Sequence, residues 1–234
     1  MLEAFGLGVL GASSLLLAGL FACWFDVPAR LVGVMAGFGA GALIAAISFD
    51  LVAEAEDALA LWQFALWMLI GVAVFLVADK MVESRFGQAG VGGAMGIVVG
   101  SVVDGVPESV IFGIQVGTAF PISLSFMAAV FVSNIPQSIA PSADLSAAGW
   151  TARRVGMLWF WIVLACGVAA ALGFLATDLV SEAQGGRAAA LAAGGLLAML
   201  TNSLMPFAFE RGGRLQARRR PSGSASPSWA VANS

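Results

Sequence analysis

The sequence contains no histidine and no tyrosine, only two cysteines, and few charges, since 11% of its 234 residues are Asp, Glu, Lys or Arg. A soluble domain carries roughly 25% charged residues. The composition therefore excludes a soluble enzyme and a nucleic-acid-binding protein. Instead, 60% of the residues are hydrophobic and the mean hydropathy is +0.94. Because a bilayer span needs about 20 apolar residues and such stretches fill the chain before residue 210, we expect a polytopic protein of the lipid bilayer.

The apolar runs are continuous and predict an all-α integral membrane protein. A transmembrane barrel would instead show alternating segments of about ten residues. Charged and turn-forming residues divide the sequence into seven predicted transmembrane helices, at about 4–25, 31–53, 58–78, 92–117, 121–143, 155–176 and 187–209. We expect a transmembrane domain at 1–210 and a basic, Ser- and Pro-rich tail at 211–234 that is disordered and lies at anionic lipid headgroups.

The basic residues predict how the chain is oriented. With seven spans, one side of the membrane receives Arg30, Lys80, Arg85, Arg153, Arg154, Arg211, Arg214, Arg218, Arg219 and Arg220. The opposite side receives only Arg187. Since Lys and Arg concentrate in cytoplasmic loops, the N-terminus is expected outside and the tail in the cytoplasm, with the protein in the cytoplasmic membrane.

Without tyrosine, tryptophan has to form any aromatic belt at the membrane surface. Trp24, Trp62 and Trp150 all fall near predicted span ends, where amphipathic rings are favoured. Cys23 and Cys166 lie in or beside apolar spans. We interpret both cysteines as small core residues and assign them no redox role.

Four carboxylates fall inside the predicted spans, where an ionisable residue is costly and points to function. Asp50 and Glu54 lie toward the outer end of the second span, and Asp104 and Glu108 lie in the middle of the fourth. Each pair is spaced i, i+4, so that both side chains share one helical face and repel each other when charged. No Lys, Arg or His lies deep in a span. A proton or a bound cation must therefore balance each pair.

Two readings without metal stay open at this point. Asp50 and Glu54 adjoin Glu56 and Asp57, so that this pair is also explained as an acidic cap at the membrane surface. Asp104 and Glu108 lie too deep for a solvated cap, but protonation would keep them neutral.

Prolines interrupt the fourth and fifth spans next to polar residues. Pro107 lies between Asp104 and Glu108 and frees the carbonyl of Val103, while Pro136 frees the carbonyl of Val132. The segments Gly105–Val110 and Asn134–Ile139 align without gaps as x-[VI]-P-[EQ]-S-[VI]. Kinked helices with free backbone oxygens are typical of transporter ion sites. We therefore expect the two helices to face each other, with the carboxylates opposite Ser133, Asn134 and Gln137, a set of oxygen ligands suited to a divalent cation.

These segments resemble the ZIP family of divalent metal transporters. The family's fourth span reads His-Asn-x-Pro-Glu-Gly, where this chain reads Asp-Gly-Val-Pro-Glu-Ser from Asp104. Its fifth span reads His-Glu-x-Pro-His/Glu-Glu/Gly, where this chain keeps only Pro136. The stretch from Asp50 to Glu54 is similar to the family's His-x-x-Pro-Glu, and the stretch 202–206 to its seventh span without the acidic ligands.

The chain departs from the family in two respects. ZIP proteins normally have eight spans, and no eighth span follows residue 210 here. Every histidine ligand is also replaced. Imidazole suits zinc, copper and iron, whereas carboxylate and carbonyl oxygens suit magnesium, manganese and calcium. The resemblance therefore implies a ZIP-like scaffold with an all-oxygen site, which leaves open whether Zn, Mn, Fe or Mg is carried.

The leading expectation is a divalent cation transporter that moves metal inward without ATP. Asp104 and Glu108 would bind the metal, Asn134, Gln137 and Ser133 would complete its shell, and Asp50 and Glu54 would attract cations at the outer mouth. No cofactor and no enzymatic activity are expected. The alternatives are a non-transporting metal sensor or assembly partner, an intramembrane aspartyl enzyme, and permeation of protons or monovalent cations.

Glycine-rich faces in the second and fourth spans allow close helix packing. They include Gly33, Gly37, Gly41, Gly92 and Gly96. The sequence does not distinguish packing within one chain from packing between two, so a homodimer stays an open alternative.

Overall fold

The protein is described from a computed structural model that covers residues 1–82, 84, 94–117, 123–177 and 185–212. These residues are almost entirely helical, and no strand occurs among them. The helical elements are α1 (Leu2–Phe21), α2 (Ala29–Ala46), η1 (Ile47–Val52), α3 (Ala53–Ala58), α4 (Leu61–Val82), α5 (Ala94–Gly117), α6 (Leu124–Ala147), α7 (Ala152–Thr177), α8 (Gly185–Met199), η4 (Leu200–Leu204) and α9 (Met205–Gly212). Because α2, η1 and α3 form one continuous helix, as do α8, η4 and α9, the described residues form seven helices, as predicted.

Five of these helices are long and apolar enough to cross a membrane: Leu2–Phe21, Ala29–Ala58, Leu61–Met81, Ala152–Thr177 and Gly185–Gly212. The chain is thus a multi-pass membrane protein. The other two helices of the described residues are α5 and α6. In α6, polar residues and two prolines, Pro136 and Pro141, replace apolar ones, and most of its polar side chains are buried.

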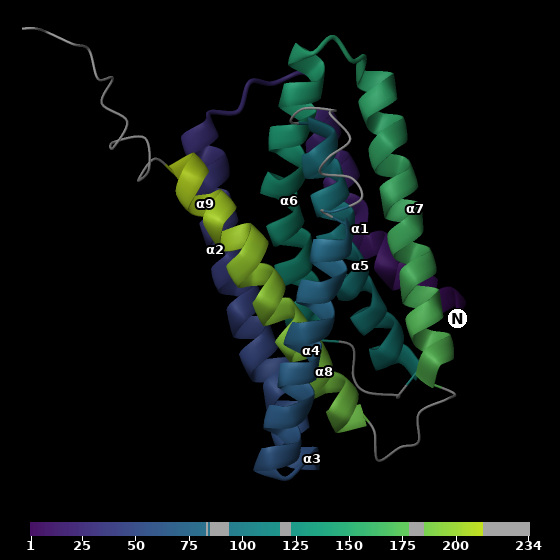
Figure 1. Ribbon diagram of the computed structural model, residues 1–234. Helices are drawn as coiled ribbons and strands as arrows, with labels where there is room; N and C mark the ends of the chain where they lie inside the picture. The colour runs from purple at the N-terminus through teal and green to yellow at the C-terminus, as the bar shows by residue number, and fades with distance from the viewer. Residues whose placement is uncertain (83, 85–93, 118–122, 178–184, 213–234) are drawn as a thin grey trace, which may run out of the picture.

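The helices lie side by side in an upright bundle with α5 at its centre (Figure 1). Helix α5 contacts α1, α4, α6, α7 and α8. Around it, α1 packs on α6 and α7, α2 packs on α6 and α9, and α4 packs on α8. The central position of α5 explains how a helix that carries two carboxylates is shielded from the surroundings.

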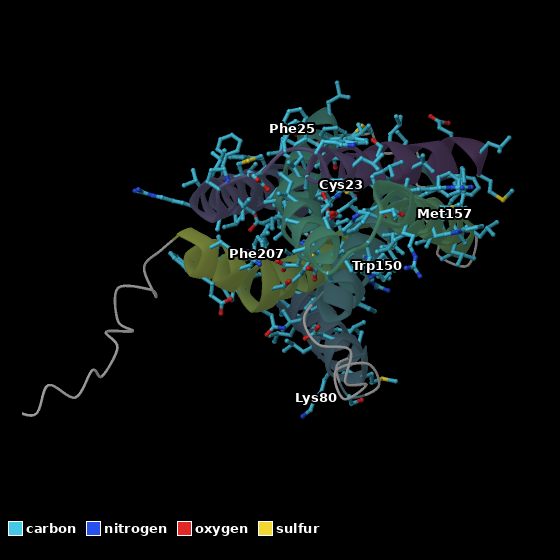
Figure 2. The ribbon with its side chains drawn as sticks, turned by 90° about the horizontal axis from the view of Figure 1, so that it is seen from above. Cys23, Phe25, Lys80, Trp150, Met157 and Phe207 are labelled. Carbon is cyan, nitrogen blue, oxygen red and sulfur yellow. The ribbon has the colours of Figure 1, made fainter. Side chains whose placement is uncertain are left out.

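The described basic residues divide between the two ends of the bundle. Arg30 begins α2, Lys80 ends α4, Arg153 begins α7 and Arg211 ends α9, all at the upper end in Figure 1. Seen from that end, Lys80 points away from the bundle (Figure 2). Arg187 lies at the start of α8, at the opposite end. The asymmetry that the sequence predicts is therefore present in the fold.

Glycines bring two helix pairs into backbone contact. A Cβ added at Gly113 of α5 would overlap the carbonyl oxygen of Ala170 in α7, and one at Gly173 would overlap that of Val110. Gly71 of α4 and Gly194 of α8 likewise meet the opposite backbone. Since the hydrophobic effect drives little helix association in a membrane, such close approach supplies the packing energy. The glycine contacts fix α5 against α7 and α4 against α8.

The helix ends differ from the predicted bounds by a few residues, and two differences matter. Helix α4 extends to Val82 and thus includes Asp79, which was expected just beyond a span. The second and last helices each contain a π-helical segment, η1 and η4, that apolar periodicity does not reveal. The predicted tail at 211–234 lies outside the described residues from residue 213 onward.

Candidate functional site

The most deeply buried ionisable group in the described bundle is the Glu108 carboxylate on α5. Glu108 is 1% exposed, and Asp104, one turn earlier, is 5% exposed. Neither carboxylate oxygen of Glu108 has a hydrogen-bond partner among the described residues. The charges of the two carboxylates act on each other. Burying a carboxylate without a donor or a cation is strongly unfavourable, so this pair requires a compensating proton or metal ion.

Asp104 belongs to a polar cluster that joins three helices. Its Oδ2 accepts a 2.7 Å hydrogen bond from the Ser203 hydroxyl in η4. The neighbouring Asn202 donates from Nδ2 to Oδ2 of Asp79 on α4 at 2.8 Å, and the charge of Asp79 reaches Asp104. Asp79 is half-buried and Asn202 is exposed. Oxygen ligands thus continue from the buried pair toward the end of the bundle where α4 ends.

The residues predicted on α6 are buried, and two of them contact other helices. Asn134 is 2% exposed, and its Nδ2 donates to the carbonyl oxygen of Gly11 in α1 at 3.4 Å. Ser133 donates to the carbonyl oxygen of Val130 at 2.9 Å, and its backbone packs against Gly39 of α2. Gln137 is 7% exposed, and its Nε2 has no hydrogen-bond partner in the described part of the chain. The free atom of Gln137 is an amide nitrogen, which donates hydrogen bonds and does not coordinate a cation.

Asp50 lies in η1, and its hydrogen bonds do not involve the carboxylate pair on α5. Its Oδ2 accepts hydrogen bonds from Ser123 and, at 2.8 Å, from Ser125. The Ser123 hydroxyl also accepts from the backbone N–H of Phe126 and caps α6. Asp50 therefore ties the π-helical segment to the first turn of α6.

This geometry predicts that Asp50 contributes to stability. We expect Asp50→Asn to lower the free energy of unfolding by about 1–3 kcal/mol, because the hydrogen bonds from Ser123 and Ser125 lose their charged acceptor and become weaker. Thermal unfolding in detergent measures the effect. Glu54→Gln, one turn later on the same helix, is the matched control and should leave the Tm nearly unchanged. Equal Tm values for Asp50→Asn and the wild type would contradict a structural role for Asp50.

Glu54 lies beside α5 and the start of α8. It lines a small hollow together with Gln115 of α5 and Ala188 of α8. Gln115 shares one face of α5 with Asp104, Glu108 and Ile111, since these positions follow the i, i+4, i+7, i+11 spacing. A polar side chain of this face, Gln115, therefore lies beyond the buried pair on the side of Glu54.

Asp79, Ser203 and Gln115 were not among the predicted site residues. Asp79 falls one residue beyond the span predicted at 58–78. Ser203 and Asn202 are polar residues inside an otherwise apolar helix. This pattern is visible in the sequence and could have identified them. The helical spacing from Glu108 would have identified Gln115.

No group of three or more His, Cys, Asp or Glu side chains that could hold a metal ion occurs within the described residues. Any cation at Asp104 and Glu108 therefore has to take neutral oxygens as well, and the Ser203 hydroxyl is hydrogen-bonded to Asp104. Carboxylate and hydroxyl oxygens are donor types that suit a hard divalent ion.

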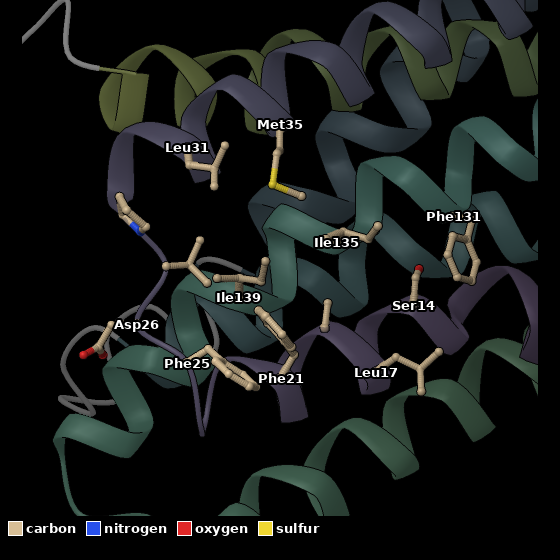
Figure 3. Close-up of a pocket in the computed structure, with 13 residues that line it drawn as sticks. Ser14, Leu17, Phe21, Phe25, Asp26, Leu31, Met35, Phe131, Ile135 and Ile139 are labelled. Atoms are coloured by element: carbon tan, nitrogen blue, oxygen red, sulfur yellow. The ribbon is translucent and has the colours of Figure 1, made fainter.

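Two sizeable grooves are lined by neither of these carboxylates. One of about 590 Å³ separates α1, α2 and α6. Figure 3 shows Leu31, Met35, Ile135 and Ile139 along it and Asp26 at one end. Its lining is apolar apart from Ser14 and Asp26. Since no pair of ionisable groups faces it, this groove offers no metal site.

No family model matches the chain, and no curated protein matches it either. The resemblance to ZIP transporters therefore depends on the four short motifs and their order.

Proposed function

We propose that this protein is a divalent metal cation transporter of the cytoplasmic membrane with a ZIP-like arrangement of seven transmembrane helices. In this proposal α5 and α6 also cross the membrane, the N-terminus is outside, and metal moves inward. The transported ion binds between the kinked helices at Asp104 and Glu108.

The observation that carries the proposal is the buried Glu108 carboxylate, whose two oxygens lack partners next to Asp104. A divalent cation would neutralise both charges and occupy the free lone pairs. A carboxylate with a structural role would be expected to pair with Arg or Lys. None of the described basic residues forms an ion pair with Glu108. The ion pair found in the described chain joins Arg211 and Asp144. Ionisable residues inside membrane proteins mark ion pathways for this reason.

The surrounding polar groups support a path through the bundle. On one side of Glu108, Ser203, Asn202 and Asp79 continue the series of oxygens. On the other side, Glu54 and Gln115 line a common hollow. Both π-helical segments lie beside this path, and π-bulges are frequent at functional sites. Exchange of oxygen ligands along this face of α5 would move the ion.

The ligand chemistry predicts which ions are preferred. All candidate ligands are oxygens, and the chain has no histidine. We expect Mn²⁺ and Mg²⁺ to be carried better than Zn²⁺, since carboxylate and carbonyl oxygens suit the harder ions.

Uptake into proteoliposomes tests this function. Purified protein is reconstituted, and the accumulation of Mn²⁺, Mg²⁺, Fe²⁺ and Zn²⁺ is compared with that in empty liposomes. The proposal predicts uptake of at least one of these ions, with Mn²⁺ or Mg²⁺ ahead of Zn²⁺. No uptake of any of them by folded protein would reject transport.

A second candidate is a metal sensor or assembly partner that binds the cation without moving it. In this candidate the two carboxylates and neutral oxygens hold the cation, since no group of three or more His, Cys, Asp or Glu side chains that could hold a metal occurs among the described residues. This candidate predicts metal binding to folded protein together with no uptake, so that the same reconstituted protein distinguishes the two functions.

A further inference from the structure

A second groove lies between α4, α5 and α8, and neither Asp104 nor Glu108 lines it. Its volume is about 540 Å³, within the range of ligand pockets in proteins. The lining is almost entirely apolar and includes Phe75 and Val74 of α4, Val110 and Ile114 of α5, and Leu191 of α8. Val74 is 55% exposed, which shows that the groove opens on the outer face of the bundle. In a membrane protein this face adjoins lipid.

One end of the groove carries a positive charge. Arg187 of α8 lines it beside Trp67 of α4, and the guanidinium carbon lies 6.0 Å from the centre of a Trp67 ring. The Arg187 Nε is buried and has no hydrogen-bond partner within the described residues. Arg187 is also the basic residue that stands apart from the others, at the opposite end of the bundle. The groove therefore combines an apolar channel with a cationic side chain whose Nε has no hydrogen-bond partner among the described residues.

We propose that this groove binds one anionic phospholipid of the surrounding bilayer. The phosphate accepts hydrogen bonds from the Arg187 guanidinium, whose planar array of donors matches phosphate oxygens. An acyl chain extends along the groove past Val74 and Leu191. An anionic head group is favoured over a zwitterionic one because Arg187 is the charged residue among those lining the groove. The inference depends on the groove and on Arg187, and it holds whether or not the protein carries metal.

The bound lipid would also contact α5 at its internal proline. Pro107, which lies between Asp104 and Glu108 in sequence, lines the same groove together with Val106. An acyl chain in this position contacts all three helices at once and ties α5 to the α4–α8 pair. The lipid is thus expected to stabilise the native bundle.

Lipid binding by the detergent-purified full-length chain tests the proposal. Native mass spectrometry and thermal unfolding are recorded with dioleoyl phosphatidylglycerol and with dioleoyl phosphatidylcholine. For the wild type we expect one phosphatidylglycerol bound at least about tenfold more tightly than phosphatidylcholine, and a higher Tm in its presence. Arg187→Gln should remove this preference, and Val74→Trp, at an exposed position that fills the groove, should reduce binding of both lipids. Arg153→Gln, at the opposite end, removes the same charge and should change neither result.

Three results would overturn the proposal. They are equal binding of both phospholipids by the wild type, an unchanged preference in Arg187→Gln, and equal loss of the preference in Arg153→Gln. If oleate binds as tightly as phosphatidylglycerol and competes with it, the occupant of the groove is a fatty acid and not a phospholipid. If Arg187→Gln does not fold, Val74→Trp still tests the proposal. Phosphatidylglycerol binding at the wild-type level in this variant would exclude the groove as the lipid-binding site.

Discussion

Replacing both buried carboxylates, as Asp104→Asn with Glu108→Gln, is expected to reduce metal uptake to the level of empty liposomes, a loss of at least about tenfold. Amides keep the size of the side chains but remove both negative charges that would bind the cation. Each 1.4 kcal/mol of lost binding energy already lowers affinity tenfold, and a divalent ion loses two charged ligands here. Initial rates of Mn²⁺ uptake in proteoliposomes measure the effect.

The stability of the same variant separates loss of function from loss of folding. Glu108 has no hydrogen-bond partner among the described residues, and its charge repels that of Asp104. Relief of this repulsion offsets the weakened hydrogen bond from Ser203 to position 104, so that without metal the variant should unfold close to the wild-type Tm. The matched control is Glu3→Gln with Asp26→Asn, which removes two exposed charges outside α5 and should retain uptake. Uptake by the Asp104/Glu108 variant above half of the wild-type rate would contradict the assigned site.

Gly113→Ala is expected to have the largest effect on stability. The new Cβ would overlap the carbonyl oxygen of Ala170 and approach the backbone nitrogen of Phe174 at 2.7 Å. Backbone atoms cannot turn aside as a flexible side chain can, so α5 and α7 have to separate. Overpacking costs about 1–3 kcal/mol and occasionally more, and the upper part of this range is expected where both obstructing groups are backbone. Thermal unfolding in detergent checks the prediction.

Gly37→Ala is the control for this substitution. Gly37 lies on α2, and a Cβ added there meets nothing within 4 Å. Because alanine also favours the helix by up to about 1 kcal/mol relative to glycine, the Gly37 variant should be as stable as the wild type or slightly more so. If both variants lose Tm to a similar extent, the close approach of α5 and α7 does not explain the requirement for glycine at position 113.

The helical class and the number of helices could be predicted because each helix has a continuous apolar run between turn-forming residues. Lys80 and Arg187 also lie at opposite ends of the bundle, as the alternation of loops requires. The burial of Asp104 and Glu108 followed from their central position in the fourth run. These properties depend on local sequence, where charges and apolar residues are directly visible.

Partners across helices could not be predicted in the same way. Asn134 was expected to face the carboxylates, but its amide donates to Gly11 of α1, since α6 contacts α1 as well as α5. Asp50 is held by two serines at the start of α6. Such contacts depend on how each helix is rotated, and a π-helical segment such as η1 shifts that rotation without a clear mark in the sequence.

Binding of Mn²⁺ to the purified protein tests the central claim most directly, because it examines the carboxylate pair without requiring transport. Electron paramagnetic resonance distinguishes free from bound Mn²⁺ during a titration in detergent. We predict one bound Mn²⁺ per wild-type chain, displaced by excess Mg²⁺, and no bound Mn²⁺ in Asp104→Asn/Glu108→Gln. Equal binding by this variant and the wild type, or no binding by folded wild-type protein, would contradict a cation site at Asp104 and Glu108.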